Sequence, residues 1–457
     1  MMGGMASEET RTQDHPDIRS PATDERRSAA EGSPMRAWSD ASGTAAGASH
    51  ARAWTMRLVV VGIVLSALNL RPAITSLGAL LEEVRDGLGM SGSVAGLLTS
   101  VPPLCFAVFG VMAPRLARRF GLGAVVCVGM AAITAGLLIR PYAGGTAGFL
   151  AASALALMGI AVSNVLMPVI VKRWFPDRVG SMTGLYSMAL ALGTSLAAAV
   201  TVPMTQAMGG GWQAGLAVWA ALAAAAVVPW MPFVRDREGA RTGGPAAAGR
   251  EPHAREDAAP APSLRITRSR TAWALAAFFG LQATAAYITM GWMAQIFRDA
   301  GVAAGTAGLL LAVTMVMGVP LAFVIPRLAT RLPQQGPIVL ALGVCGLAGY
   351  AGLYLAPAQG AWAWALLLGV SNCAFPLALT MVGMRARTGA GVAQLSAFAQ
   401  STGYLISIPG PLLVGVLYQH SGGWGLPLAL MAALMVPQMA VGILAGRNRT
   451  VEDEAAR

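Results

Sequence analysis

Two segments of this chain are diverged copies of each other. Residues 96–119 and 308–331, aligned without a gap, agree at nine of 24 positions, including the run Pro-Arg-Leu-Ala that begins at Pro114 in the first copy and at Pro326 in the second. A second pattern, Ser-Asn-x-x-x-Pro from Ser163, recurs 208 residues later. Two repeats at nearly the same offset predict a chain built from two duplicated halves, and parallel repeats of several helices are known in membrane proteins.

Long apolar runs recur along most of the chain. The composition is 55% hydrophobic and only 12% charged, whereas a soluble protein carries about 25% charged residues. Runs of about 20 apolar residues, enough to cross a bilayer, occur twelve times between residues 58 and 445. They are apolar on all sides, which excludes a large soluble helical protein. The predicted fold is an all-α integral membrane protein with twelve transmembrane helices in two six-helix parallel pseudo-repeats.

The basic residues predict the orientation in the membrane, because short cytoplasmic loops are enriched in Arg and Lys. If the first span starts inside, the short outside loops hold only Arg85, Arg140 and Arg298. The short inside loops then hold ten basic residues, namely Arg115, Arg118, Arg119, Lys172, Arg173, Arg178, Arg327, Arg331, Arg385 and Arg387. Both termini are therefore expected in the cytoplasm.

This orientation gives a five-part organisation. Residues 1–56 are polar and are expected to form a disordered cytoplasmic tail without a cleavable signal peptide. Residues 57–233 and 271–446 form the two six-helix halves. Residues 234–270, rich in Gly, Ala and Pro, are expected to be a flexible cytoplasmic linker, and residues 447–457 a short cytoplasmic tail. The four cysteines lie inside spans without a Cys-x-x-Cys pair and are expected to be structural.

Charged groups are almost absent from the expected membrane interior. Every Asp and Glu lies in a tail, the linker, a loop or a span end, and of the four histidines only His420 lies near a span. An intramembrane enzyme would need a nucleophile, base or metal cluster, so neither an enzyme nor a cofactor or metal is expected. No nucleotide-binding loop occurs. Proton-driven transporters usually carry an acidic or histidine relay in the membrane, so a coupling ion, a proton or another, is left open.

Arg71 is the exception among the basic residues. It lies roughly 21 Å along the first span at 1.5 Å per residue, and burying a cation there costs about 2.5–3.5 kcal/mol. With no deep carboxylate available, its counter-ion is expected to be a substrate anion or polarised group, with Asn69 beside it and Pro72 opening the helix backbone. The alternatives are a structural Arg71 satisfied by helix carbonyls and Asn69, or one that reaches outward to Glu82 and Glu83.

The repeated Ser-Asn-x-x-x-Pro pattern has a mechanical meaning. A proline cannot bond the carbonyl four residues earlier, so Pro168 frees that of Asn164 and Pro376 frees that of Asn372. Each half thus gains an unpaired carbonyl and an amide at one place, for substrate binding or for packing between helices. Pro72, Pro168 and Pro376 are predicted hinges.

The seventh span carries further polar candidates. Gln282 and Tyr287 can share one broad helix face, and both are predicted to bind substrate. Trp292 lies nearer the outer end, where tryptophan is commonly an interfacial anchor, and that interpretation is favoured.

These features resemble the major facilitator superfamily over roughly residues 57–446. The superfamily's turn after the second span reads G-x-x-x-D-R-x-G-R-R, where this chain has Gly110, then Pro114 in place of Asp and Ala117 in place of Gly. Its Asp-centred charge contact is therefore not carried over. The basic residues of this turn and of its repeat are predicted to act in conformational change, and they are Arg115, Arg118, Arg119 and Arg327.

The variant motifs are similar to those of the cyanate-permease and nitroimidazole-transporter family. They include Asn69-Leu-Arg-Pro72, Asn164-Val-Leu-x-Pro168, Phe175-Pro and Gln400-Ser-x-Gly-Tyr404. The resemblance implies a secondary transporter, expected as a monomer in the bacterial inner membrane, that moves a cyanate-like anion or a nitro-heteroaromatic by alternating access. Spans 1, 4, 7 and 10 would line its cavity. Two alternatives remain, an exporter of neutral or aromatic compounds and a non-transporting membrane sensor.

Overall fold

The computed structural model describes residues 53–234 and 266–455. The predicted tail up to residue 52 and the predicted linker over 235–265 lie outside the described residues. Residues 55–457 belong to one compact unit, and the fold described here is that of this unit. The part of the chain that the structure describes is helical, and it contains twelve stretches long and apolar enough to cross a membrane. The predicted number of spans is therefore confirmed.

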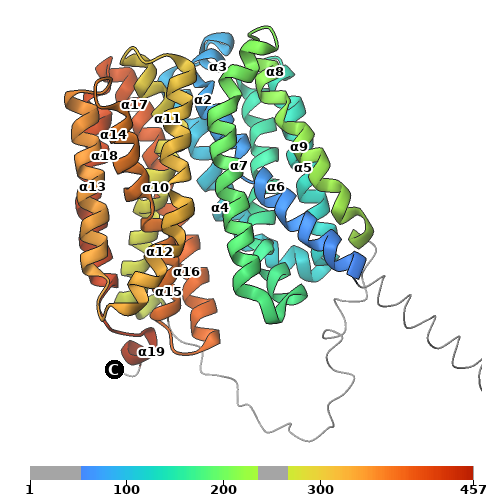
Figure 1. Ribbon diagram of the computed structural model, residues 1–457, viewed down its shortest axis with the longest axis vertical. Helices are drawn as coiled ribbons and strands as arrows, with labels where there is room; N and C mark the ends of the chain where they lie inside the picture. The colour runs from blue at the N-terminus through green and yellow to red at the C-terminus, as the bar shows by residue number, and fades with distance from the viewer. Residues whose placement is uncertain (1–52, 235–265, 456–457) are drawn as a thin grey trace, which may run out of the picture. The chain divides into compact units, whose positions relative to one another are not determined.

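The first half holds six spans (Figure 1). Residues 53–69 are helical and run into α2 (Pro72–Ala79), and α3 (Leu81–Leu88) follows at the end of the bundle. The next spans are α4 (Gly92–Phe120), α5 (Leu122–Ile139) with η1 (Arg140–Tyr142), and α6 (Thr146–Trp174) with η2 (Pro176–Arg178). The half is completed by α7 (Val179–Ala207), α8 (Trp212–Ala217), α9 (Trp219–Val227) and η3 (Val228–Val234).

The second half has the same number of spans. It begins with η5 (Ile266–Arg268) and α10 (Arg270–Asp299), followed by α11 (Ala304–Val316) with α12 (Gly318–Arg331) and by α13 (Gly336–Leu355). The remaining spans are α14 (Ala361–Asn372) with α15 (Ala374–Met384), α16 (Gly389–Ser407) with α17 (Pro409–Ser421), and α18 (Gly425–Ala445). A short helix, α19 (Val451–Ala455), closes the described chain.

Several spans are broken, and proline accounts for part of the pattern. Pro72 and Pro409 each stand at the first position of a helix, where the missing N–H costs nothing. Span 10 is interrupted at Cys373, three residues before Pro376. By contrast, α6 passes through Pro168 without interruption. Of the predicted proline hinges, Pro72 and Pro376 lie at or beside a break in the helix and Pro168 does not.

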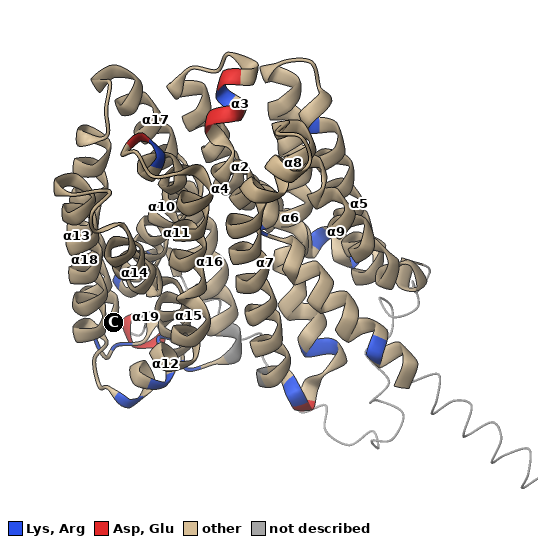
Figure 2. Ribbon diagram, turned by 45° about the horizontal axis from the view of Figure 1, so that its top comes forward, with Lys and Arg blue, Asp and Glu red and all other residues tan. Residues whose placement is uncertain are grey.

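The charged residues of the described helices gather mainly at the two ends of the bundle, and its middle is mostly uncharged (Figure 2). One end carries α3 with Glu82 and Glu83, and it is called the α3 end here. The opposite end carries the loop after α6 and the helix α19, and it is called the α19 end. This distribution is what the low dielectric of a bilayer interior requires of charged side chains.

Candidate functional site

A central cavity of about 240 Å³ lies between the two halves. Its lining residues come from spans 1, 5, 7, 8, 10 and 11, and they include Arg71, Thr194, Tyr287, Asn372 and Tyr404. Span 4, which the family resemblance placed beside spans 1, 7 and 10, contributes no lining residue. The cavity is mostly apolar with a few polar groups, which is the usual composition of a small-molecule site.

Arg71 is the cation of this cavity. It stands at the break between residues 53–69 and α2, where its carbonyl accepts the first hydrogen bonds of α2 from Ile74 N (2.9 Å) and Thr75 N (3.1 Å). The break turns its side chain out of the regular helix, and the guanidinium carbon lies 5.8 Å from the ring centre of Phe106. This is within the range of a cation–π contact.

No described carboxylate neutralises Arg71. The tyrosines Tyr287, Tyr404 and Tyr186 lie near its guanidinium. Glu82 and Glu83, which the sequence offered as alternative partners, bind Arg298 instead. The buried Tyr287 hydroxyl interacts with Arg71. A guanidinium can only donate hydrogen bonds, so this contact uses the hydroxyl oxygen and leaves its O–H free to donate to a bound solute.

Aromatic rings surround the guanidinium. The ring of Phe106 lies 5.1 Å from that of Tyr404 and 6.4 Å from that of Tyr287, measured between centroids. The ring of Phe279 continues the cluster, 5.2 Å from Tyr404 and 5.5 Å from Phe375. Tyr287, Tyr404 and Phe375 line the cavity directly. The site therefore combines one positive charge with flat apolar walls, which suits an anion or a planar polar ring.

Gln282 and Asn372, both predicted to bind substrate, lie side by side and bind each other. Gln282 Nε2 donates to the backbone carbonyl of Asn372 (3.1 Å) and to its side-chain Oδ1 (2.8 Å), while Gln282 Oε1 accepts from Gln438 Nε2 (2.8 Å). Gln282 thus satisfies the carbonyl that Pro376 leaves without an N–H. It is 1% exposed and absent from the cavity lining, whereas Asn372 and Pro376 line the cavity.

The structure places the other two predicted amides away from the cavity. Asn69 is fully buried, its Nδ2 lies 3.9 Å from Met130 Sδ, and its Oδ1 has no partner among the described residues. Asn164 Oδ1 accepts a hydrogen bond of 2.7 Å from Tyr186 Oη. Since Tyr186 lies near Arg71, Asn164 is connected to the site through that tyrosine.

The predicted basic hinge residues lie at the α19 end. Arg115, Arg118 and Arg119 are exposed in the last turns of α4, and Arg327 is exposed in α12. The guanidinium of Arg119 lies 5.2 Å from the ring centre of Phe120. No salt bridge involves these four arginines within the described residues.

The halves are joined at the α3 end. Arg298 of α10 binds Glu82 (2.8 Å) and Glu83 (2.9 Å) of α3. Ser93 N and Oγ both donate to Gln419 Oε1, at 2.8 and 2.7 Å. These contacts hold the first half against α10 and α17 above the cavity.

Close backbone packing supports the same closure. A Cβ added to Gly96 of α4 would lie 2.9 Å from the carbonyl oxygen of Leu412. Trp292 is fully buried and donates to Thr99 Oγ1 across 3.2 Å, so the prediction that it anchors the protein at the lipid interface is wrong. By sequence, a tryptophan near a span end fits either an interfacial anchor or a buried contact between helices. Only the position of α4 against Trp292 distinguishes the two.

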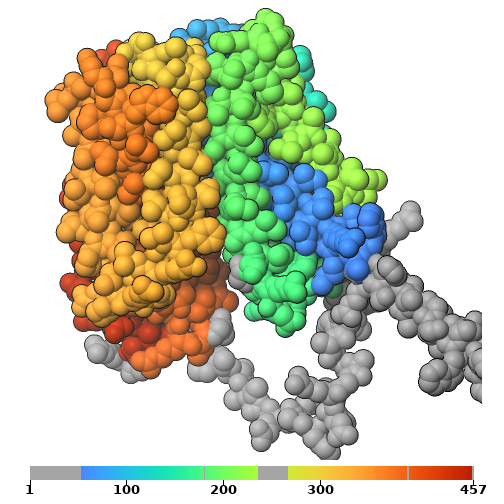
Figure 3. Space-filling view, in the orientation of Figure 1, coloured from blue at the N-terminus to red at the C-terminus, as the bar shows by residue number. Residues whose placement is uncertain are grey.

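The cavity extends the other way, toward the α19 end. Its lining includes Ser187, Ala322 and Leu379, which lie on the α19 side of their helices, and a second cavity of about 170 Å³ adjoins it between α7 and α12. In the space-filling view the two halves touch in the upper part of the seam and separate near its lower end (Figure 3). The structure is therefore closed at the α3 end.

Sequence reasoning missed several of these residues. Phe106, Phe375 and Tyr186 are ordinary apolar or aromatic residues of a span, and nothing in their spacing marks them. Their role depends on which helices face the cavity. The pairing of Arg298 with Glu82 and Glu83 had a weak signal in the sequence, since these residues follow spans 1 and 7 at the same end, and the two spans correspond in the two halves.

Comparison with known proteins gives a consistent result. The family model described as Major Facilitator Superfamily matches residues 59–407. The uncharacterized transporter YycB of Bacillus subtilis is 34% identical over 395 residues, covering 86% of this chain and 94% of that protein. The 2-nitroimidazole transporter of Escherichia coli is 31% identical, with coverages of 86% and 96%. The cyanate transport protein CynX of E. coli is 30% identical, with coverages of 83% and 94%.

Solved structures agree on the fold. The inward open xylose transporter XylE of E. coli superimposes with a TM-score of 0.66 at 11% identity, covering 88% of this chain and 99% of that chain. The nucleoside transporter NupG gives a TM-score of 0.66 at 14% identity, with coverages of 86% and 98%. At such low identity these matches describe the fold alone.

Proposed function

Because the chain belongs to the Major Facilitator Superfamily, we propose that it is a secondary active transporter that moves a small anionic or polar solute, with Arg71 as the substrate-binding charge. It is a multi-pass membrane protein with twelve apolar helices, which we place in a bacterial inner membrane as a monomer. The observation that carries the proposal is a cation in the central cavity that has no carboxylate partner among the described residues.

The electrostatics of Arg71 support an anionic or strongly polarised solute. A cation in the membrane interior is costly unless an opposite charge or several hydrogen-bond acceptors accompany it. A bound anion would provide the missing charge, and the Tyr287 hydroxyl would donate a hydrogen bond to it. An Arg–anion contact is stronger in this environment than in water, because the surrounding dielectric is low.

The relatives support two chemical forms of such a solute. Their names give cyanate for one and 2-nitroimidazole for another. Cyanate is a linear anion, and a nitroimidazole is a flat ring with a polarised nitro group. Arg71 can bind either negative end, and the rings of Phe106, Tyr287 and Tyr404 can cover a flat face.

The direction of access follows from the expected orientation. With the basic loops in the cytoplasm, the α3 end faces outward and the α19 end faces inward. The structure would then be the inward-facing state, closed outside by Arg298 with Glu82 and Glu83. Alternating access would require these contacts to break while the α19 end closes.

A second candidate is export of neutral or aromatic compounds. The observation that favours it is the aromatic and mostly apolar lining around Tyr287, Phe375 and Tyr404. Such a substrate would bind by ring stacking and would need Arg71 only as a cation over an aromatic face. Replacing the charge of Arg71 therefore separates the two candidates.

The test is solute flux into proteoliposomes that contain the purified protein. Labelled cyanate is the probe, 2-nitroimidazole is the competitor, and an imposed proton gradient is present or absent. The proposal expects saturable flux that Arg71→Gln abolishes, while a control at an exposed arginine, Arg449→Gln, keeps wild-type flux. Equal flux by a well-folded Arg71→Gln protein would contradict the role of Arg71 and favour the exporter.

A further inference from the structure

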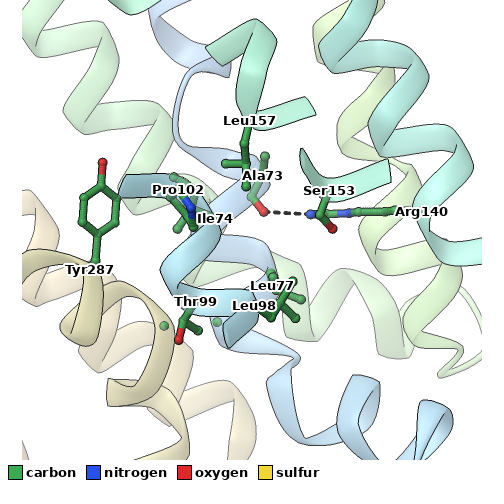
Figure 4. Close-up of a pocket in the computed structure, with 12 residues that line it drawn as sticks. Ala73, Ile74, Leu77, Leu98, Thr99, Pro102, Arg140, Ser153, Leu157 and Tyr287 are labelled. Carbon is green, nitrogen blue, oxygen red and sulfur yellow. Dashed lines mark hydrogen bonds between the residues drawn. The ribbon is translucent and has the colours of Figure 1, made fainter. Parts of the chain in front are cut away.

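Arg140 is a second cation inside the first half, and the proposed function does not use it. It ends α5, begins η1 and is 2% exposed. Its position after an apolar run predicts an outside loop. Its side chain instead points into the bundle, between α2 and α6 (Figure 4).

The guanidinium of Arg140 binds α2. Its Nη1 donates to the backbone carbonyl of Ala73 across 2.9 Å, and its Nη2 lies 3.5 Å from Ser76 Oγ. Ala73 is two residues from Arg71. Arg140 therefore contacts the same eight-residue helix, α2, that has Arg71 at its start.

This helix needs support from its neighbours. The helix of span 1 is interrupted at Leu70 and Arg71, so α2 is separate from the helix over residues 53–69. A helix of eight residues is not stable alone. On the side of the second half, Gly78 lies directly against the backbone carbonyl of Met290, where a Cβ could not fit. That face of α2 is fixed by close packing.

A small cavity of about 20 Å³ adjoins α2. Its lining includes Ala73, Arg140 and Ser153, and also Gly78 and Tyr287 on the side of the second half. Arg140 Nε and Ser153 Oγ have no hydrogen-bond partner among the described residues. The hydrogen bonds of Arg140 to Ala73 and Ser76 are directional contacts that fix α2 from the side of α6.

We propose that Arg140 is a positioning residue that holds α2 so that Arg71 presents its guanidinium to the central cavity. A purely structural cation would be an expensive choice at this position, because an apolar side chain fills membrane-buried space at lower cost. The consequence for substrate affinity rests on the proposed function of Arg71. The mechanical part, the fixing of α2, does not depend on it.

The chain offers a matched control in Arg385. It is also 2% exposed and also donates to backbone carbonyls, those of Ala445 and Gly446, both at 2.9 Å. It belongs to the second half at the α19 end and is not a lining residue of the cavity. Arg385→Lys thus removes a comparable set of contacts without touching α2.

The first measurement is hydrogen–deuterium exchange of the whole protein in detergent, read on peptides that cover residues 72–79. Arg140→Gln should accelerate exchange there by about 10-fold, since hydrogen bonds from a charged group contribute that order of protection. Arg140→Lys should fall between wild type and Arg140→Gln, and Ser76→Ala should give a smaller effect in the same direction. Arg385→Lys should leave this peptide unchanged.

The second measurement is flux of labelled cyanate by the same variants, with 2-nitroimidazole as the alternative probe. Arg140→Lys should raise KM by about 10-fold and change the maximal rate little, because a misplaced Arg71 weakens binding. Arg385→Lys should lower thermal stability and leave KM unchanged. In an Arg71→Lys background, Arg140→Lys should raise KM by a smaller factor than it does alone, because both changes act on the contact between residue 71 and the substrate.

The outcomes separate the two proposals. Unchanged exchange over residues 72–79 in Arg140→Gln would overturn the positioning role, whatever the flux shows. Faster exchange together with a KM equal to wild type would also overturn it, because α2 would then move without affecting the site. Absence of flux for both probes in the wild type counts against the proposed substrates, and the exchange result still decides whether Arg140 fixes α2.

Discussion

Gln282 Nε2 donates to the backbone carbonyl of Asn372 across 3.1 Å, and this bond repairs the gap that Pro376 makes in span 10. The same amide reaches Asn372 Oδ1, and its oxygen accepts from Gln438. One side chain therefore connects α10, α14 and α18. The helix can break beside the cavity without leaving a buried carbonyl unpaired, which a membrane interior would penalise by several kcal/mol.

Gln282→Leu should therefore destabilise the protein by about 1–3 kcal/mol, because it leaves the Asn372 carbonyl and the Gln438 amide unpaired. Thermal unfolding in detergent measures this loss. Gln400→Leu is the matched control, since Gln400 Nε2 binds only Ser396 one turn earlier on the same helix. If both variants lost the same stability, the bridge between α10 and α14 would not be the cause.

Replacing Arg298 should shift the protein toward the state that is open at the α3 end. Arg298→Gln removes two partly exposed salt bridges between the halves, each contributing roughly 0.2–1 kcal/mol, so the open population should rise a few-fold. Spin labels at Asp86→Cys and Gly423→Cys would report the separation of the halves at that end. High salt should reproduce part of the shift in the wild type.

The control for this shift is Arg387→Gln. It breaks the salt bridge of 2.6 Å between Arg387 and Asp453, which lies within the second half. The label distance should stay at its wild-type value. A longer distance in this control as well would mean that loss of any arginine loosens the protein, and the gate assignment would fail.

The fold could be predicted from the sequence because its signals are long and repeated. Twelve apolar runs and two duplicated segments can be recognised even when each predicted boundary is wrong by a few residues. Arg71 could be found because a single cation in an apolar run has no local explanation. The prolines at 72 and 376 could be placed at helix breaks because proline lacks an N–H. Pro168 lies within the uninterrupted α6, so a missing N–H alone does not decide where a helix breaks.

The rest of the site depends on which sides of the helices pack against each other. Asn69 and Asn164 are as polar as Asn372, yet only Asn372 lines the cavity. Phe106 carries no polar group and still lies against Arg71. The apolar run before Arg140 predicts a loop position, whereas its long side chain reaches back into the bundle. Span order along the chain contains none of this information.

Tyr287→Phe should weaken binding of an anion and spare a neutral aromatic ligand. The change keeps the ring beside Phe106 and removes the buried hydroxyl beside Arg71, whose O–H is free to donate to an anion. Loss of one hydrogen bond to a charged group is worth about 1.5–3 kcal/mol, so KM for cyanate should rise at least ~10-fold. Tyr354→Phe is the control, because Tyr354 is exposed. An unchanged KM in Tyr287→Phe would remove this hydroxyl from the binding site.

The C-terminal helix α19 is held by its carboxylates. Glu454 accepts hydrogen bonds from Ser269 Oγ (2.6 Å), Thr271 Oγ1 (2.7 Å) and Thr271 N (3.1 Å), all at the start of α10. Partial burial acts to raise the pKa of Glu454, but these hydrogen bonds outweigh it, and the pKa lies below its ordinary value. The neighbouring charges are Glu452 and Asp453, with Arg387 bound to Asp453.

This lowered pKa predicts an acid-sensitive attachment of α19. A carboxyl group whose pKa is lower in the folded state stabilises that state above its unfolded pKa, about 4.3 for Glu, and the stabilisation disappears as pH falls through the folded value. Proteolysis after residue 446 should therefore be slow at neutral pH and should accelerate below about pH 4.3. Glu454→Gln should be cleaved faster at neutral pH and respond less to acid, although Glu452 and Asp453, whose pKa values are also lowered, preserve part of the response. Asp86→Asn at the opposite end, where Asp86 is exposed, is the control and should be cleaved like wild type. Equally fast cleavage of this variant and Glu454→Gln would show that the effect is not local to α19.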